Sequence, residues 1–129
     1  MPESRFVLDT NAVIFLATRG NIIPSGLEDE LNKADLCISV ISEIELFSKS
    51  ALPQNEEKEL RTFLSERIFI IDLTGAVKNE TIALRRNTRI KLPDCIVVAT
   101  AVVLNAVFLT ADKELLNLSW PGLRTQNIL

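Results

Sequence analysis

The chain has 129 residues, of which 47% are hydrophobic and 24% are charged, and its net charge is −3. This balance predicts one compact domain over residues 1–129 and excludes a largely disordered chain. The absence of histidine and tyrosine excludes the Ser-His-Asp triad and histidine-ligated zinc. Because the net charge is negative, binding of a nucleic acid would need a local basic patch or bound cations.

Three features predict a cytoplasmic protein without a membrane span. Residues 1–5 lack the basic stretch and apolar core of a secretory signal. The most apolar stretch, residues 95–109, is shorter than a membrane-spanning helix. Cys37 and Cys95 lie far apart in apolar surroundings, so we expect both to be reduced core residues.

Short apolar runs alternate with amphipathic stretches in the first half of the chain. Two capping boxes, Ser25 with Glu28 and Ser42 with Glu45, predict helix starts, and Thr10 or Asn11 is expected to cap the first helix. The predicted strands are residues 6–8 and 36–40, and the predicted helices end near residues 19, 34, 49 and 66, the last beginning at residue 56.

The second half continues the same alternation. Pro93 is expected at the first position of a helix that is apolar nearly all round and therefore buried. Strands are predicted at residues 68–71, 107–109 and 123–128, the last at an edge, and helices at 75–86, 93–104 and 113–117. This order is typical of an α/β domain with a mainly parallel sheet.

Four acidic residues stand where a strand ends or a helix begins: Asp9, Glu45, Asp94 and Asp112. In a parallel α/β sheet the strands end and the helices begin along one edge, which is where ligands bind. We therefore expect these four side chains to converge, although they span more than a hundred positions.

Each acid taken alone has a simpler explanation. Acids are favoured in the first turn of a helix, and Glu45 completes a capping box. Asp112 has the position of an N-cap, and Asp94 opens a helix after a proline. Asp9 is harder to explain in this way, because it directly follows an apolar strand, where a charge is costly unless it is paired or solvated. These explanations cover single residues but not four acids at one edge.

Clustered carboxylates repel one another unless some are protonated or a cation binds them. Mg²⁺ and Mn²⁺ prefer oxygen ligands and are held by carboxylates, waters and substrate phosphates. Such ions activate a water molecule and stabilise the leaving oxygen in phosphodiester cleavage. The acid cluster therefore predicts metal-assisted hydrolysis, a reaction that needs no histidine.

Four segments carry a family resemblance. Residues 8–11 (LDTN) resemble the opening of PIN domains, and residues 38–46 resemble the family's second block, which ends in E-L. Residues 92–101 (LPDCIVVATA) are similar to the third block, and residues 109–112 (LTAD) to the fourth. The blocks occur in order and span nearly the whole chain, from residue 8 to residue 112. The chain therefore resembles the PIN-domain ribonucleases.

The resemblance implies a three-layer α/β/α fold around a parallel sheet and cleavage of single-stranded or structured RNA with Mg²⁺ or Mn²⁺. It implies four metal ligands and catalytic residues: Asp9, Glu45, Asp94 and Asp112. Single-domain members of this length resemble VapC-type toxins of VapBC toxin–antitoxin systems. Such toxins are held inactive by a co-expressed antitoxin and are often homodimers.

The resemblance also chooses between neighbouring acids. Glu43 and Glu45 are two positions apart and point to different sides of a helix, and the E-L match selects Glu45 and leaves Glu43 solvated. The fourth block departs from the family, in which N-D or R-D follows the threonine. Here Asp112 follows an alanine, so Asp112 is our choice for the fourth acid and Glu114 the alternative.

Other residues have both functional and structural interpretations. A basic run before Asp94 is expected to contact RNA phosphates, although basic residues are also favoured at a helix C-terminus; it comprises Arg85, Arg86, Arg89 and Lys91. Asn11 and Thr110 are expected to orient the acids or metal-bound waters, or to act as local caps. An apolar stripe is expected in the core or, if exposed, under an antitoxin helix or second subunit; it comprises Ile44, Leu46, Phe47, Ala51 and Leu52.

Two alternative functions remain at this stage. A phosphoacceptor receiver domain has a similar length and an aspartate after its first and third strands, as Asp9 and Asp72 would be, with a late lysine comparable to Lys113. It normally has paired acids after the first strand, and it needs no acid such as Asp94 at the start of a buried helix. The second alternative is a PIN-like scaffold that binds RNA or a partner without cutting.

Overall fold

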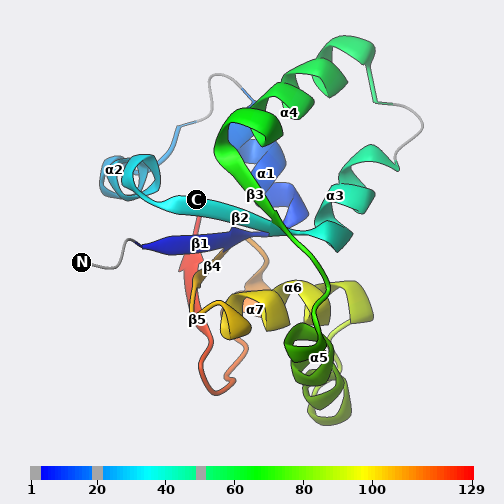
Figure 1. Ribbon diagram of the computed structural model, residues 1–129. Coiled ribbons are helices and arrows are strands. Elements are labelled where there is room, and N and C mark those ends of the chain that lie inside the picture. The colour runs from blue at the N-terminus through cyan, green and yellow to red at the C-terminus, as the bar shows by residue number, and fades with distance from the viewer. Residues whose placement is uncertain (1–3, 19–21, 49–51) are drawn as a thin grey trace.

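The computed structural model describes residues 4–18, 22–48 and 52–129. Its sheet has the strand order β3-β2-β1-β4-β5, and every pairing among these strands is parallel (Figure 1). The strands are β1 (Arg5–Leu8), β2 (Asp35–Ser39), β3 (Ile68–Ile71), β4 (Val107–Thr110) and β5 (Arg124–Asn127). The parallel sheet and the edge strand near the C-terminus, both predicted from the sequence, are confirmed.

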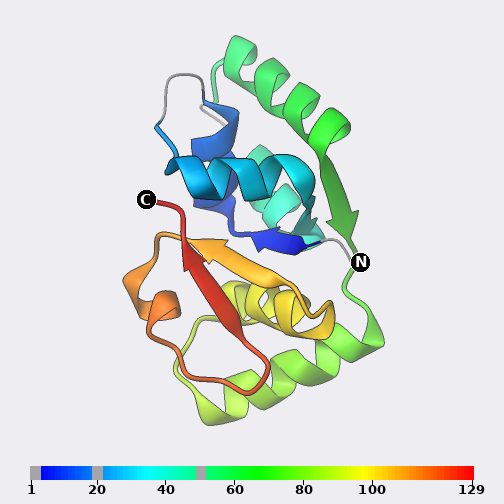
Figure 2. The same cartoon turned by 90° about the vertical axis from the view of Figure 1, so that its left-hand side faces the viewer.

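Helices cover both faces of this sheet, as Figures 1 and 2 show. The first layer comprises α1 (Thr10–Ala17), α2 (Ser25–Lys33), α3 (Val40–Phe47) and α4 (Gln54–Arg67). The second comprises α5 (Gly75–Asn87), α6 (Leu92–Val103) and α7 (Lys113–Leu116). The predicted three-layer α/β/α fold is therefore confirmed. No helix within the described residues is long and apolar enough to cross a membrane.

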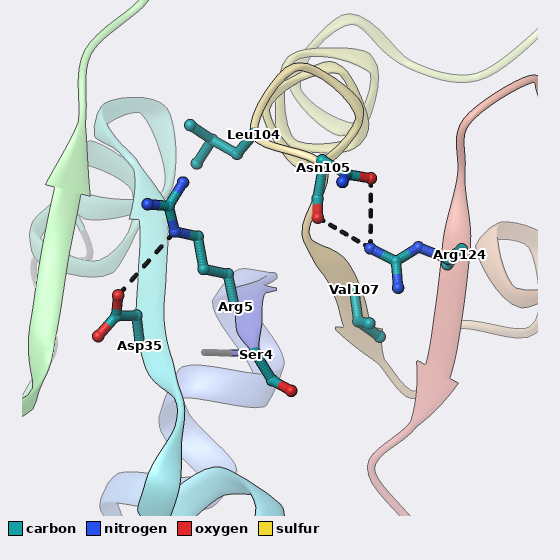
Figure 3. A pocket seen from close by; sticks show the side chains of 7 residues that line it. All are labelled: Ser4, Arg5, Asp35, Leu104, Asn105, Val107 and Arg124. Carbon is teal, nitrogen blue, oxygen red and sulfur yellow. Dashed lines mark hydrogen bonds and ion pairs between the residues drawn. The ribbon is translucent and has the colours of Figure 1, made fainter. Parts of the chain in front are cut away.

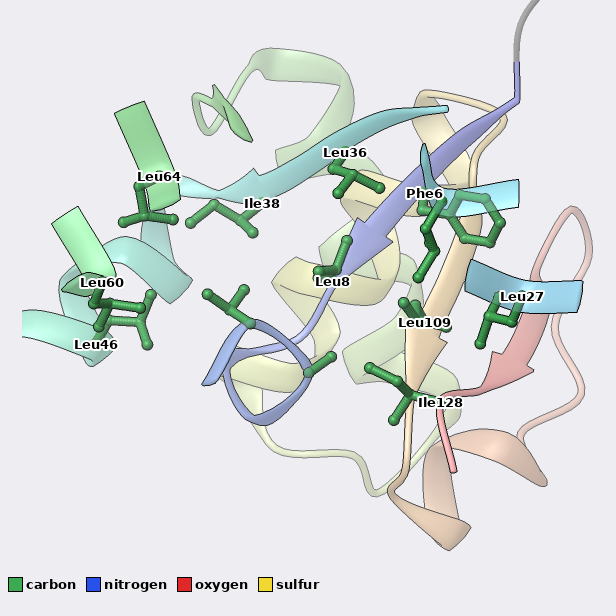
Figure 4. Packing of buried hydrophobic residues seen from close by; sticks show 13 residues of the cluster. Phe6, Leu8, Leu27, Leu36, Ile38, Leu46, Leu60, Leu64, Leu109 and Ile128 are labelled. Carbon is green, nitrogen blue, oxygen red and sulfur yellow. The ribbon is translucent and has the colours of Figure 1, made fainter. Parts of the chain in front are cut away.

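The alternation of side chains along the strands creates one apolar core on each face of the sheet. Phe6 and Leu8 of β1 lie in the first core, between the sheet and α1, α2 and α4 (Figure 4). Val7 points the other way and joins Phe108 and the buried face of α6. Each fully buried Leu or Phe contributes about 1.5–3 kcal/mol, so the two cores fix the ends of the central strands.

The interior assignments of the sequence analysis are correct. Six of the seven residues from Cys95 to Ala101 are buried, which confirms α6 as a central element: Cys95, Val97, Val98, Ala99, Thr100 and Ala101. Both cysteines are buried free thiols. Burial raises the pKa of each thiol, which keeps the reactive thiolate scarce and fits a packing role.

The predicted helix starts were less accurate, and both capping boxes are wrong. Pro24 occupies the N-cap position of α2 without a side-chain cap, and Ser25 is already helical. In α3, Ser39 is the N-cap and its hydroxyl accepts a hydrogen bond from the Ile41 N–H. Ser42 therefore lies inside the helix, where its buried hydroxyl has no partner among the described residues.

The remaining differences concern element boundaries. Asp9, rather than Thr10 or Asn11, is the N-cap of α1. Helix α6 begins at Leu92, so Pro93 is its second residue. The predicted helix ends at residues 19 and 49 lie outside the described residues, as does Ala51 of the apolar stripe. These shifts of one to three positions leave the order of the elements unchanged.

Candidate metal and active site

The site lies where the chain changes direction across the sheet. From β1 the chain continues to β2 on one side, whereas β4 pairs with β1 on the other. In open parallel sheets such a switch point leaves a crevice beyond the carboxyl ends of the strands. Figure 1 shows that α1, α3 and the first turn of α6 all begin at this edge. The four acids lie on segments near this edge: Asp9 after β1, Glu45 in α3, Asp94 in the first turn of α6 and Asp112 after β4.

Asp9 is held in place from two elements. Its Oδ1 accepts a hydrogen bond from the Ala12 N–H at 2.8 Å, and its Oδ2 accepts one from the Thr110 hydroxyl at 2.5 Å. The Thr110 oxygen in turn accepts the Asp112 N–H at 3.0 Å. Burial raises the pKa of the Asp9 carboxyl, the Thr110 and Ala12 donors oppose that rise, and the negative charges of Asp112 and Glu45 add to it.

Asp94 is half-buried in the first turn of α6. Burial raises the pKa of its carboxyl, and repulsion by three other acids raises it further: Asp112, Glu45 and Asp9. The positive charge of Lys91 lowers the pKa of the Asp94 carboxyl. All four acids predicted from the sequence therefore interact electrostatically in the folded chain.

Asp112 combines a structural role with membership of this cluster. Its Oδ1 accepts hydrogen bonds from the N–H groups of Glu114 and Leu115 at 2.8 and 3.2 Å, so it caps α7. Asp112 also raises the pKa of both Asp9 and Asp94, whereas Glu114 contributes to neither. Between the two residues proposed for the fourth acid, the fold brings Asp112 to the cluster.

The structure also distinguishes the two glutamates of α3. Glu45 is exposed, and its negative charge raises the pKa of both Asp9 and Asp94. Glu43 does not contribute to the pKa shift of either aspartate. It lines a cavity of about 290 Å³ between α3, α4 and β3. Glu43 is half-buried there and lies away from the other acids of the site.

Sequence reasoning missed the role of Thr10 at this site. The Thr10 hydroxyl donates a hydrogen bond to Oε1 of Glu45 at 3.0 Å, across 35 positions of the chain. From the sequence alone, Thr10 was expected only to cap the first helix. Asn11 is exposed, and its side chain makes no hydrogen bond within the described residues. The signal for Thr10 was its place directly after Asp9, but its partner depends on how α1 packs beside α3.

The basic run before Asp94 divides into two parts. Arg85 donates a hydrogen bond to the Ile90 carbonyl at 2.6 Å and so closes the connection between α5 and α6. Arg86, Arg89 and Lys91 are exposed and form no ion pair within the described residues. Among these three, Lys91 alone affects the pKa of an acid of the cluster, which is Asp94.

The donor set fits a hard divalent cation. It consists of carboxylate oxygens whose mutual repulsion a cation would relieve. Among the described residues, no three acidic or sulfur side chains are already gathered as a complete ligand set. Mg²⁺ does not require one, because it keeps several waters and binds one or two carboxylates together with substrate phosphates.

A polar cavity lies at the opposite edge of the sheet, where the strands begin (Figure 3). Its volume is about 530 Å³, and none of the four acids lines it. Its two guanidinium groups have partners within the protein. Arg5 Nε lies 3.9 Å from Asp35 Oδ2, and Arg124 Nη2 donates to the Asn105 carbonyl at 2.8 Å. The candidate site therefore remains at the carboxyl edge.

Comparison with known families matches residues 6–121 to the PIN domain. The chain belongs to the PIN-domain family. The resemblance found in four sequence blocks is thereby confirmed. A comparison with curated proteins finds no match.

Among the solved structures similar to this PIN domain are chains of toxin–antitoxin complexes. A chain of VapBC2 from Rickettsia felis, bound to a DNA fragment from its promoter, is 26% identical with a TM-score of 0.76, covering 95% of this chain and 98% of that one. A chain of a toxin–antitoxin complex from Klebsiella pneumoniae is 27% identical with a TM-score of 0.69, covering 91% and 93%. DNA-bound VapBC from Salmonella typhimurium matches at 24% identity and a TM-score of 0.75, covering 98% and 99%.

The fold also decides against the receiver domain. Strand β2 lies between β1 and β3, so Asp72, which follows β3, is not beside Asp9. Asp72 is exposed and does not act on the Asp9 carboxyl. A phosphoacceptor site would need these two acids together.

Proposed function

We propose that this PIN-domain protein is a Mg²⁺- or Mn²⁺-dependent endoribonuclease and the toxin of a toxin–antitoxin pair. The observation that carries the proposal is the mutual repulsion of Asp9, Glu45, Asp94 and Asp112 at the switch point of the sheet. The repulsion itself adds nothing to the stability of the fold, because each added carboxylate makes the others harder to ionise. A bound divalent cation would neutralise this repulsion, so cation binding explains why the four acids lie together.

In this proposal the four acids would together hold one or two cations, each through one or two carboxylates and waters. A bound cation would supply an activated water and stabilise the leaving oxygen of the phosphodiester. Thr110 and the Ala12 N–H fix the Asp9 carboxylate and favour its charged form. Lys91, exposed beside Asp94, would contact an RNA phosphate, with Arg86 and Arg89 as further contacts. Because the net charge is −3, RNA binding would depend on these cations and the metal.

Purified protein is expected to cut labelled single-stranded RNA in the presence of Mn²⁺ or Mg²⁺ and to lose that activity in EDTA. The measurement is the rate of product formation on a panel of RNA sequences, since a toxin can be sequence-specific. A folded protein that binds Mn²⁺ but cuts no RNA of the panel would contradict the nuclease and favour the PIN-like scaffold.

The antitoxin would be recognised at an apolar groove between α1, α3 and α4. The groove has a volume of about 470 Å³, with a floor of Ile14, Ala17, Leu46, Leu52 and Leu60. Glu56 and Glu59 stand at its rim. This composition fits an amphipathic segment that carries basic residues beside its apolar ones. The similar chains from Rickettsia felis and Klebsiella pneumoniae belong to toxin–antitoxin complexes, which supports such a partner.

The substitution Ile14→Asp is expected to weaken binding of the co-expressed antitoxin by about 100-fold. It places a charge on the apolar floor of the groove, a change comparable to the loss of an interface hot spot. Titration calorimetry measures the affinity. Ile22→Asp is the matched control, because Ile22 is 88% exposed and does not line the groove. Equal affinities of the two variants would mean that the antitoxin binds elsewhere.

A second copy of the chain is the other proposed partner. Exposed apolar side chains gather near the free edge of the sheet at β3: Ile44, Phe69, Ile70 and Leu73. An edge strand with exposed apolar residues is normally covered, because its unpaired backbone groups otherwise invite aggregation. A homodimer through this edge would cover them.

A further inference from the structure

Glu45 differs from the other acids of the site in how it is held. Asp9 and Asp112 accept backbone N–H groups and cap the helices that follow them. Asp94 is half-buried in the first turn of α6. Glu45 stands six residues into α3, is exposed, and has a longer side chain with more rotatable bonds. Its own helix therefore gives its carboxylate no fixed position.

The hydroxyl of Thr10 supplies the fixed point that α3 lacks. It donates to Glu45 Oε1 at 3.0 Å, and Thr10 is the residue next to Asp9 in the chain. Asp9 itself is anchored to α1 and, through Thr110, to β4. A single side chain thus ties the acid from α3 to the segment that carries the first acid. Oε2 of Glu45 has no partner among the described residues and remains available to a ligand.

A purely structural role for this bond is a weak explanation. Both side chains lie near the surface, where a hydrogen bond between them contributes little to stability because water competes for both groups. A donor to a metal-ligating carboxylate has a larger effect, because it orients the ligand and raises the affinity for the ion. The contact is therefore better explained by the site than by the fold.

We propose that Thr10 is a positioning residue that holds Glu45 for the divalent cation. The inference rests on the proposed metal-dependent function. Thr110 does the same for Asp9, so two threonine hydroxyls, from the first and last blocks of the site, each orient one carboxylate. Thr10 touches neither the reacting atoms nor the substrate in this scheme and acts through Glu45.

The test compares Thr10→Val, which keeps the shape and loses the hydroxyl, with Thr10→Ser, which keeps the hydroxyl. Mn²⁺ affinity is measured by titration calorimetry without RNA, and kcat and KM are measured separately. Thr10→Val is expected to weaken Mn²⁺ binding roughly 10-fold, the lower end for loss of an outer partner of a ligand. Thr10→Ser is expected to restore it. Thr62→Val, an exposed change on α4, is the matched control.

A double-mutant cycle separates positioning from other effects. If Thr10 acts through Glu45, then Thr10→Val adds no further loss of Mn²⁺ affinity to Glu45→Gln. Additive losses would overturn the inference, as would equal Mn²⁺ affinities of Thr10→Val and the wild type. Failure of the wild type itself to bind Mn²⁺ would instead contradict the proposed function. Circular dichroism melts check that each variant is folded.

Discussion

Replacing Asp94 by asparagine is expected to lower metal-dependent RNA cleavage roughly 1000-fold or more while the protein stays folded. Such a loss corresponds to about 4 kcal/mol of transition-state stabilisation, within reach of one misplaced metal ligand. Asp94 interacts with all three other acids and with Lys91. Its replacement therefore changes the charge at the centre of the cluster. Asparagine has the same size, so the packing at the start of α6 should be kept.

Asp9→Asn is expected to have an effect of similar size. Asparagine can still accept the Ala12 N–H and cap α1, because asparagine is among the preferred N-cap residues. The variant removes the negative charge at the carboxyl end of β1 and the charge-assisted bond from Thr110. The helix should remain while the cation loses a ligand.

The two variants are measured beside Asp72→Asn, which changes an exposed acid after β3 without touching the cluster. Rates are compared in Mn²⁺, in Mg²⁺ and in EDTA. Cleavage by Asp9→Asn or Asp94→Asn at the wild-type rate with Mg²⁺ would show that the ligand assignment is wrong. Equal rates of all proteins in EDTA would point to a contaminating nuclease.

The sequence predicted the sheet and the acids because these features rest on strong, local patterns. Each central strand is a short apolar run, and an acid or hydroxyl residue follows where the run ends, as Asp9 does after Leu8. Parallel strands then bring such residues to one edge whatever the details of the loops. The placement of these residues at the sheet edge therefore does not depend on any individual side-chain contact.

The helix starts and the hydroxyl partners depended on contacts that the sequence does not display. Ser39 and Ser42 both lie near the start of α3, and β2 passes directly into α3 at Ser39, so the earlier serine is the cap. The partner of Thr10 is 35 positions away and depends on the packing of α1 against α3. A capping pattern predicts that a helix begins nearby, but tertiary packing selects the residue.

In the absence of metal, Asp94→Asn is expected to raise the melting temperature at neutral pH by roughly 2–4 °C. The ionised Asp94 carboxylate is half-buried and faces three like charges, so it destabilises the folded state. Solvent screening keeps the penalty relieved by the variant to about 1 kcal/mol or less. A substitution that abolishes activity is thus expected to stabilise the metal-free fold.

The pH dependence of this difference follows from the direction of the pKa shift. Folding raises the pKa of Asp94 above its ordinary value of 3.8, so the folded state binds the proton more tightly. Protonation of Asp94 therefore contributes stability to the metal-free wild type, fully present below pH 3.8 and lost as pH rises through the raised pKa. Asp94→Asn has no carboxyl to protonate at this position. The difference in free energy of unfolding between the two proteins therefore becomes smaller in acid.

Metal is expected to reverse the order of stability. Saturating Mg²⁺ stabilises the wild type by mass action, about 2.7 kcal/mol at 100 times the dissociation constant, and Asp94→Asn far less. Thermal melts in EDTA at neutral and acidic pH, and in Mg²⁺, measure both effects, with Asp72→Asn as control. A variant less stable than the wild type in EDTA at neutral pH would show that Asp94 supports the fold. With the expected result, the acid cluster costs stability that the cation restores, as a site kept for catalysis requires.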